Sequence, residues 1–554
     1  MKRHYNMGII AGLLLAAQAI SPASAAGVDN GAAITRADLT TPVTTFPTDL
    51  VTGANQTQFA NYAWRLFIAA TQQTTASLHS GAGRAVGDGV HNFITTGASP
   101  ANTNPLVFES FYHRTEAFPF YSPGNKPPSP INALPVYYTY YSNKSGGQVP
   151  LTLSGQNYVY LDETNQIGQN LLYYQNSYAP DFPVLFMAKV NQIEATYALG
   201  KTTLPSNGSS WNFPNNVVEV KTAWRRVKDI KNSNPSNYHQ ASATYYMAGA
   251  DGVPVPYTDT FALIAIHIIQ KTANYQQFIF TTFEHVDAVT RNGSNAITDP
   301  AYKTEYNNLS YQSPNQDPHT ATVNGAYSIN RSGLPSQPNK LTTYTLPKKG
   351  PISQNYTTVV QPNTIAKEVN DVNNQVNALV KSINAGNIWG NYRLKGVQAV
   401  PTSNSDTKNY YLANIVVESS QPGIQLFSGV LLNGGLPAQG KTNPANFYFV
   451  NCRGAVGTST CVYPEADLNN GNPPGTYNNV SVSAADGQPV PAPAFSMGGC
   501  QGCHGAAQQA GRDFSFLASG ATGRGRELDS VPAADLSAAE KAAHNTFISR
   551  HSKF

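Results

Sequence analysis

The feature that most constrains this chain is the motif Gly498-Gly499-Cys500-Gln501-Gly502-Cys503-His504-Gly505, close to its C-terminal end. C-x-x-C-H is the attachment signal for c-type haem, because two thiols at this spacing reach the two vinyl groups of the porphyrin and the adjacent imidazole reaches the iron. We therefore expect Cys500 and Cys503 to bind one haem c covalently and His504 to be the proximal iron ligand. The stretch 505–554 is too short to wrap a haem alone, so the preceding chain must cover much of the porphyrin.

Other uses of a C-x-x-C pair fit less well. A zinc site would need a second pair of thiols or imidazoles, and Cys452 and Cys461 are too far apart in sequence for the usual zinc knuckle. A thioredoxin-like redox pair is expected in a compact βαβ setting, which this sequence does not show. A chance C-x-x-C-H is the remaining alternative.

The ligand on the opposite face of the iron is not specified by the sequence. Electron-transfer proteins with this motif usually supply a downstream methionine, but no methionine follows Met497 here. The candidates are Met187, Met247, His267, His285, His544 and His551. For the two strand histidines the alternative is a satisfied, half-buried side chain, and for the last two it is a solvated terminal helix.

The N-terminus predicts export. Lys2 and Arg3 precede an apolar run, and Ala23-Ser24-Ala25 resembles a cleavage site, so residues 1–25 are typical of a signal peptide. No later apolar stretch is long enough for a transmembrane anchor, which favours a periplasmic or secreted protein. In that compartment Cys452 and Cys461, which flank a short loop, are expected to form a structural disulfide.

The composition favours strands joined by many turns. The chain has 44 Gly, 38 Pro and 31 Tyr, with 12% charged residues. We expect a mainly β fold with a few helices (α+β), in which a β-rich body spans 26–490 and a haem-attachment segment with a terminal helix spans 491–554. The net charge of +4 gives no support for nucleic-acid binding.

Two helices are expected from apolar periodicity. Over 56–75, six apolar residues fall on one helical stripe, and over 364–384 six more recur at alternating steps of four and three. The second pattern allows an intermolecular coiled coil, but three heptads favour packing on its own domain. The Gly-, Ser- and Asn-rich stretch 76–105 is expected to be a loop, and 107–160 to contain short aromatic strands.

The densest strand signal lies between Val217 and Val289. NVVEVKTAW alternates, which places Val218, Val220 and Thr222 on one face of a strand and Val217, Glu219 and Lys221 on the other. The next 29 residues, from Phe261, predict two strands around a polar turn near Asn274. A turn centred near Tyr275 would pair Ala265 with His285 and His267 with Phe283, which would bring both histidines to one face. The segments WGNYRLKGVQAV, NYYLANIVVES and NPANFYFVNC predict further strands.

Several of these segments, together with FANYAWRLFIAA, FESFYHRTEAFPF and CQGCHGAAQQAGRDFSFL, occur in the same order as in a group of large exported bacterial proteins labelled cytochrome c family. The chain resembles this group over about residues 58–518. The resemblance implies haem attachment at Cys500, Cys503 and His504, and it names no substrate. The last helix is an extension relative to the group.

These features favour an exported monohaem protein that transfers electrons to a redox partner protein or serves as the redox subunit of a larger system. No nucleophile elbow, metalloprotease motif or dinucleotide fingerprint is present in the sequence. The alternative is a haem-dependent oxygenase or peroxidase-like enzyme acting on an organic substrate, with His267, His285 or Arg225 distal to the iron. A third possibility is a β-rich binding protein with an incidental redox group.

Overall fold

The structure is a computed structural model of the 554-residue chain. It describes residues 27–118, 133–142, 148–154, 157–161, 170–176, 179–201, 211–230, 233–248, 254–288, 341–345, 355–358, 365–399, 460–461, 477–478, 504, 513, 515 and 517. The expected signal peptide and most of 491–554 lie outside these residues.

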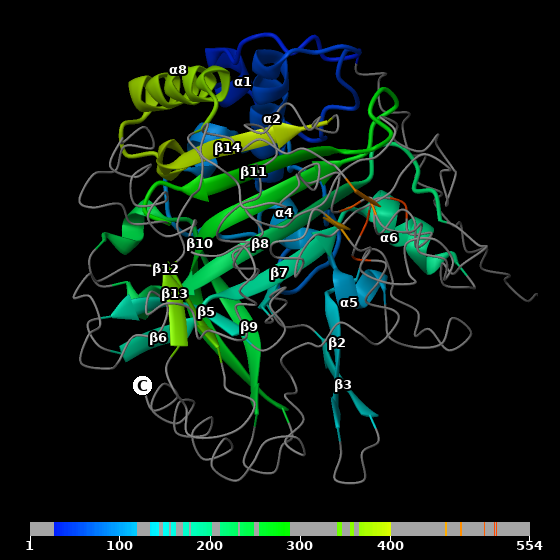
Figure 1. Cartoon of the computed structure of the whole chain (residues 1–554), viewed down its shortest axis with the longest axis vertical. Coiled ribbons are helices and arrows are strands. Elements are labelled where there is room, and N and C mark those ends of the chain that lie inside the picture. Colours follow the sequence, from blue (N-terminus) through cyan, green and yellow to red (C-terminus); the bar gives the residue numbers. More distant parts are fainter. Residues whose placement is uncertain are drawn as a thin grey trace, which may run out of the picture.

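The centre of the fold is an eight-stranded sheet, which runs across Figure 1. The strand order is β1-β7-β8-β10-β11-β14, and β9 pairs with both β10 and β4. All pairs are antiparallel except β4 with β9. The strands are β1 (Tyr112–His113), β4 (Val159–Leu161), β7 (Leu185–Val190), β8 (Val218–Arg226), β9 (Gln240–Ala248), β10 (Pro254–Gln270), β11 (Ile279–His285) and β14 (Tyr392–Gln398). The expected strand-rich α+β class is confirmed for the described part of the chain.

Smaller antiparallel sheets accompany the main one. A four-stranded sheet has the order β13-β12-β5-β6, and β2 pairs with β3 while β15 pairs with β16. Their bounds are β2 (Val136–Ser142), β3 (Gln148–Ser154), β5 (Asn170–Asn176), β6 (Ala179–Pro183), β12 (Leu341–Thr345), β13 (Asn355–Thr358), β15 (Thr460–Cys461) and β16 (Tyr477–Asn478). The aromatic strands expected in 107–160 are confirmed as β2 and β4, whereas 107–118 forms two short helices around β1.

The helices are α1 (Arg36–Thr40), α2 (Gln56–Ala70), α3 (Phe93–Thr96), α4 (Val107–Ser110), α5 (Arg114–Ala117), α6 (Gln192–Leu199) and α8 (Lys367–Ile383). In Figure 1, α1, α2 and α8 lie together on one side of the main sheet, and α5 and α6 lie near its β7 end. The stretch 76–105 is a loop as expected, apart from the single turn α3.

The first long helix, α2, begins at a capping box. The Asn55 side chain accepts from the Gln58 amide, and the Gln58 side chain accepts from the Asn55 amide. Its expected apolar stripe is buried against the sheet, where Phe67 stacks on Phe283 at 4.4 Å. The helix ends at Ala70, before the expected 75. The Thr71 amide still donates to the Phe67 carbonyl, but the Gln72 side chain donates to the Ile68 carbonyl at 2.8 Å while the Gln72 amide turns to the Ala69 carbonyl.

The second long helix, α8, packs on its own domain. Val369, Val372, Val376 and Val380 are buried against α2 and β14. The prediction that this helix packs on its own domain is therefore confirmed. Burying four valines from a fully exposed state contributes on the order of 1.5–3 kcal/mol each before entropy is counted.

The β10–β11 hairpin differs from its expected register by one residue. Ala265 pairs with Glu284 and His267 with Thr282. The prediction that His267 and His285 share a face is wrong, because a shift of one residue moves a side chain to the opposite face of a sheet.

The turn of this hairpin explains the shift. Phe278 has a left-handed backbone with φ of 67°, and its amide donates to the Tyr275 carbonyl at 3.1 Å. The Tyr275 hydroxyl donates to the carbonyl of Val51 at 2.6 Å, so the turn is shaped by the N-terminal loop that it packs against. This tertiary contact is not visible in the local sequence.

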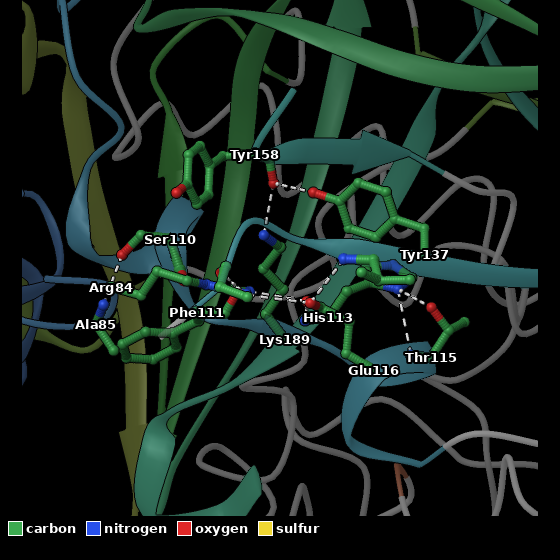
Figure 2. A network of polar contacts seen from close by, with 12 residues as sticks. Arg84, Ala85, Ser110, Phe111, His113, Thr115, Glu116, Tyr137, Tyr158 and Lys189 are labelled. Atoms are coloured by element: carbon green, nitrogen blue, oxygen red, sulfur yellow. Dashed lines mark hydrogen bonds and ion pairs between the residues drawn. The ribbon is translucent and has the colours of Figure 1, made fainter. Parts of the chain in front are cut away.

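A buried polar network joins the loop after α2 to α5 and β7 (Figure 2). Arg84 forms a bidentate ion pair with Glu116: Nη1 lies 3.1 Å from Oε1 and Nη2 lies 2.9 Å from Oε2. Both side chains are 1% exposed. Lys189 donates to the carbonyls of Glu109 and Tyr158. Burial lowers the pKa of Lys189 to about 7, with the charge of Arg84 as the next cause. We assign this network a structural role, because its cations bond to a carboxylate and to main-chain carbonyls of neighbouring segments.

Candidate functional site

The haem motif is represented in the structure by His504, whereas Cys500 and Cys503 lie outside the described residues. The His504 ring meets the ring of Phe280 edge to face, with centroids 4.7 Å apart. Phe283, three residues along the same strand, stacks on α2. Because side chains alternate along a strand, His504 lies on the face of the sheet opposite α2. We call this side the Phe280 face; it also carries Glu219 and His267.

An ion pair ties the chain after the motif to the same face. Lys271 directly follows β10, and its ammonium lies 2.6 Å from Asp513 Oδ2 and 2.6 Å from Asn212 Oδ1. The amide of Phe213 donates to the same Asp513 oxygen at 2.9 Å. The Lys271 and Asp513 side chains are 0% and 9% exposed. Burial lowers the pKa of Lys271, while Asp513 acts in the opposite direction.

An aromatic cluster supports this attachment. Its members pack together in one apolar core, and Leu517 packs against it from the C-terminal stretch. The aromatic residues are Tyr112, Phe118, Trp211, Phe213, Phe278 and Phe280. The described residues His504, Asp513, Ser515 and Leu517, with the sheet residues that they touch, form what we call the C-terminal contact.

Two buried glutamates lie at the C-terminal contact. Glu194 is in the first turn of α6 and Glu219 is on β8, and they are 0% and 3% exposed. Val190, the last residue of β7, pairs with Glu219, which brings the two carboxyl groups into one region. Both oxygens of Glu194 and Oε1 of Glu219 are buried and meet no hydrogen-bond donor of the described chain, and Ser515 donates to Glu219. Burial raises the pKa of Glu219 to about 7, and burial with the neighbouring Glu219 raises the pKa of Glu194 well above its ordinary value.

Backbone strain concentrates at the same place. Within the described residues, four non-glycine residues have positive φ: Ala85, Asn216, Phe278 and Asp513. The last three belong to the C-terminal contact or touch Lys271, to whose carbonyl the Asn216 amide donates at 2.7 Å. Such conformations persist where surrounding structure holds them, and they cluster at functional sites.

The structure separates the candidates for the second iron ligand. His267 lies on the Phe280 face and is buried, with Nδ1 3.4 Å from the Thr281 carbonyl. Met187 belongs to the core on the α2 side. Met247 lies on β9, and His544 and His551 lie outside the described residues.

His285 is not supported as an iron ligand. Its Nε2 lies 3.0 Å from the Asn237 carbonyl, and its Nδ1 accepts from the Asp287 amide at 3.1 Å. The ring also stacks on Tyr238 with centroids 3.7 Å apart. Burial lowers the pKa of His285 to about 4, so the ring stays neutral as part of the core. Both ring nitrogens are already used.

The described residues nearest to His504 are apolar and aromatic. A porphyrin needs an apolar surface and an imidazole held in a fixed direction, and the aromatic cluster and the Phe280–His504 contact provide these. The described residues contain no group of three or more His, Cys, Asp or Glu side chains that could hold a metal ion by themselves. His504 is a candidate iron ligand because of its place in the C-x-x-C-H motif.

The ion pair between Lys271 and Asp513 gives a testable prediction. Lys271→Met leaves the Asp513 carboxylate buried without the ammonium that it contacts, so we expect the free energy of unfolding to fall by about 1–3 kcal/mol. Urea denaturation would measure the loss. The double variant Lys271→Met/Asp513→Asn removes the stranded charge and should recover part of it; no loss in the single variant would contradict the anchor.

Sequence reasoning missed most of the C-terminal contact. Glu194, Lys271 and Asp513 were not predicted as site residues, since the ion pair joins positions 242 residues apart. The alternation of NVVEVKTAW did place Glu219 opposite Val218 and Val220, but not its burial. Cys461 lies in β15 and Cys452 outside the described residues, so their disulfide stays a prediction.

In the part of the chain that the structure describes, no helix has both the length and the apolar character to cross a membrane. Comparisons of the chain with protein-family models, with curated proteins and with solved structures found no match.

Proposed function

We propose that this chain is an exported c-type monohaem protein that transfers electrons, alone or as the redox subunit of a larger system. The observation that carries the proposal is the position of His504, from the C-x-x-C-H motif, on the Phe280 face beside an aromatic cluster. When bound, the haem iron supplies one-electron chemistry by changing between its ferrous and ferric forms.

The chain's own residues have distinct roles in this proposal. Cys500 and Cys503 would hold the porphyrin, and His504 would be the proximal ligand. Phe280 fixes the orientation of the His504 ring by edge contact, and the Lys271–Asp513 pair fixes the segment that follows. The aromatic cluster keeps water from that side, which favours a stable potential.

His267 is our candidate for the second protein ligand. Among the histidines considered for this role, His267 is the one that the described structure places on the Phe280 face, on β10 and one strand over from Phe280. An iron with two protein ligands suits electron transfer, because no position is open for a substrate. The electron partner would be another protein with an exposed redox group.

Absorption spectra with and without carbon monoxide test this function. We expect the reduced wild-type protein to be low-spin and unchanged by carbon monoxide, and His267→Ala to bind carbon monoxide. The variant His79→Ala removes an exposed histidine that is far in sequence from both His267 and His504, and it should behave like the wild type. A high-spin wild-type iron that binds carbon monoxide would favour the oxygenase or peroxidase-like alternative instead.

A further inference from the structure

The carboxyl groups of Glu194 and Glu219 meet in the interior without a cation between them. No donor of the described chain reaches either oxygen of Glu194 or Oε1 of Glu219, and Glu219 is the group whose charge acts most strongly on Glu194. An ionised carboxylate only accepts hydrogen bonds, so contact between two carboxyl groups requires a proton on one of them. We call these residues the carboxyl pair.

The surroundings do not neutralise the carboxyl pair. Lys271, the ammonium nearest to the C-terminal contact, bonds to Asp513, whose negative charge itself raises the pKa of both glutamates. The other charged or titratable groups that face this region are Lys221 and His267 on the same side of the sheet and Arg114 on α5, which packs on α6. None of these appears among the causes of the two pKa shifts.

The carboxyl pair also contacts the chain that follows the haem motif. The Ser515 hydroxyl donates to Glu219, and Ser515 is 0% exposed. Asp513, two residues earlier, is held by Lys271 and by the Phe213 amide. Ionisation of both glutamates would put two negative charges beside Asp513 in a buried region, which costs far more than it would in water.

We propose that Glu194 and Glu219 share one proton, and that this proton keeps Asp513 and Ser515 in place on the sheet. Loss of the proton at higher pH weakens the C-terminal contact, so pH controls how firmly the haem-attachment segment is held. The contact of the carboxyl pair with Asp513 and Ser515 does not depend on bound haem.

The direction of the pH effect follows from proton linkage. In an unfolded chain a glutamate ionises near pH 4.5. In the folded protein burial raises the pKa of Glu219 to about 7 and the pKa of Glu194 well above its ordinary value. The folded state therefore binds more protons in this window, and stability falls as pH rises. The stabilisation is complete below about pH 4.5, declines as Glu219 ionises at about pH 7, and is lost fully when Glu194, whose pKa is raised well above its ordinary value, ionises as well.

Infrared spectroscopy and hydrogen exchange test the proposal on the purified full-length protein. The wild type should show the carbonyl band of a buried protonated carboxylic acid at about pH 6, and this band should weaken as the pH rises through about 7. Over the same range, the protection factor of the peptide containing Asp513 and Ser515 should fall by up to about tenfold per pH unit.

Glu194→Gln and Glu219→Gln provide the matched variants. Each supplies an amide that donates to the remaining carboxylate, so each should lose the band and keep the peptide protected at high pH. Two variants guard against a failure of either one to fold, and Glu368→Gln, exposed on α8, should behave like the wild type. An unchanged band in both pair variants, or wild-type protection that does not depend on pH, would overturn the proposal.

Discussion

Arg84→Met is expected to lower the free energy of unfolding by about 3–5 kcal/mol, because it leaves Glu116 charged and buried. Arg84 satisfies more than this carboxylate. Its guanidinium also donates to the carbonyls of Ser110 and Phe111, and it lies 4.2 Å from the ring centre of Tyr112. The substitution therefore disconnects the loop after α2 from α4 and α5. Urea denaturation followed by far-UV circular dichroism would measure the effect.

Two controls define the origin of the loss. Arg84→Met/Glu116→Gln removes the stranded charge and should be more stable than the single variant. Lys367→Met breaks an exposed ion pair with Asp371, which has a similar distance of 2.6 Å, and should change stability little. A loss of less than about 1 kcal/mol in Arg84→Met would contradict the structural role of the network.

Replacing both motif cysteines, Cys500→Ser and Cys503→Ser, is expected to abolish covalent haem. A c-type haem is retained through two thioether bonds, so the doubly substituted chain should emerge colourless from denaturing electrophoresis stained for haem. The protein would be exported in a bacterial host that attaches haem c, and the haem stain would be compared with the amount of chain.

The matched control is the other cysteine pair. Cys452→Ser/Cys461→Ser removes the expected disulfide, and its haem stain per chain should equal that of the wild type. Free-thiol titration of the wild type under denaturing conditions would then report whether this pair is oxidised. Equal haem stain in the Cys500/Cys503 variant and the wild type would contradict covalent attachment at the motif.

Local patterns were enough to predict the elements that pack through one apolar face. The stripe of α2 and the seam of α8 identified both helices, alternation identified β8, and two apolar runs around a polar turn identified the β10–β11 hairpin. These features depend on a periodicity that each segment carries by itself.

Features set by distant contacts could not be predicted. The hairpin register differed by one residue because Tyr275 and its turn pack on the N-terminal loop. The helices α4 and α5 span only one turn each, too short to show a helical period. The C-x-x-C-H motif is visible in the sequence. The surface that His504 contacts is built from segments between α6 and β11, which are far from the motif along the chain.

The proposed function requires one haem bound covalently near the C-terminal end of the chain. Intact mass spectrometry of the purified mature protein after acid-acetone extraction tests it most directly. We predict a polypeptide that remains coloured and exceeds its sequence mass by one haem. A colourless polypeptide with the unmodified mass would rule out covalent attachment of haem to this chain.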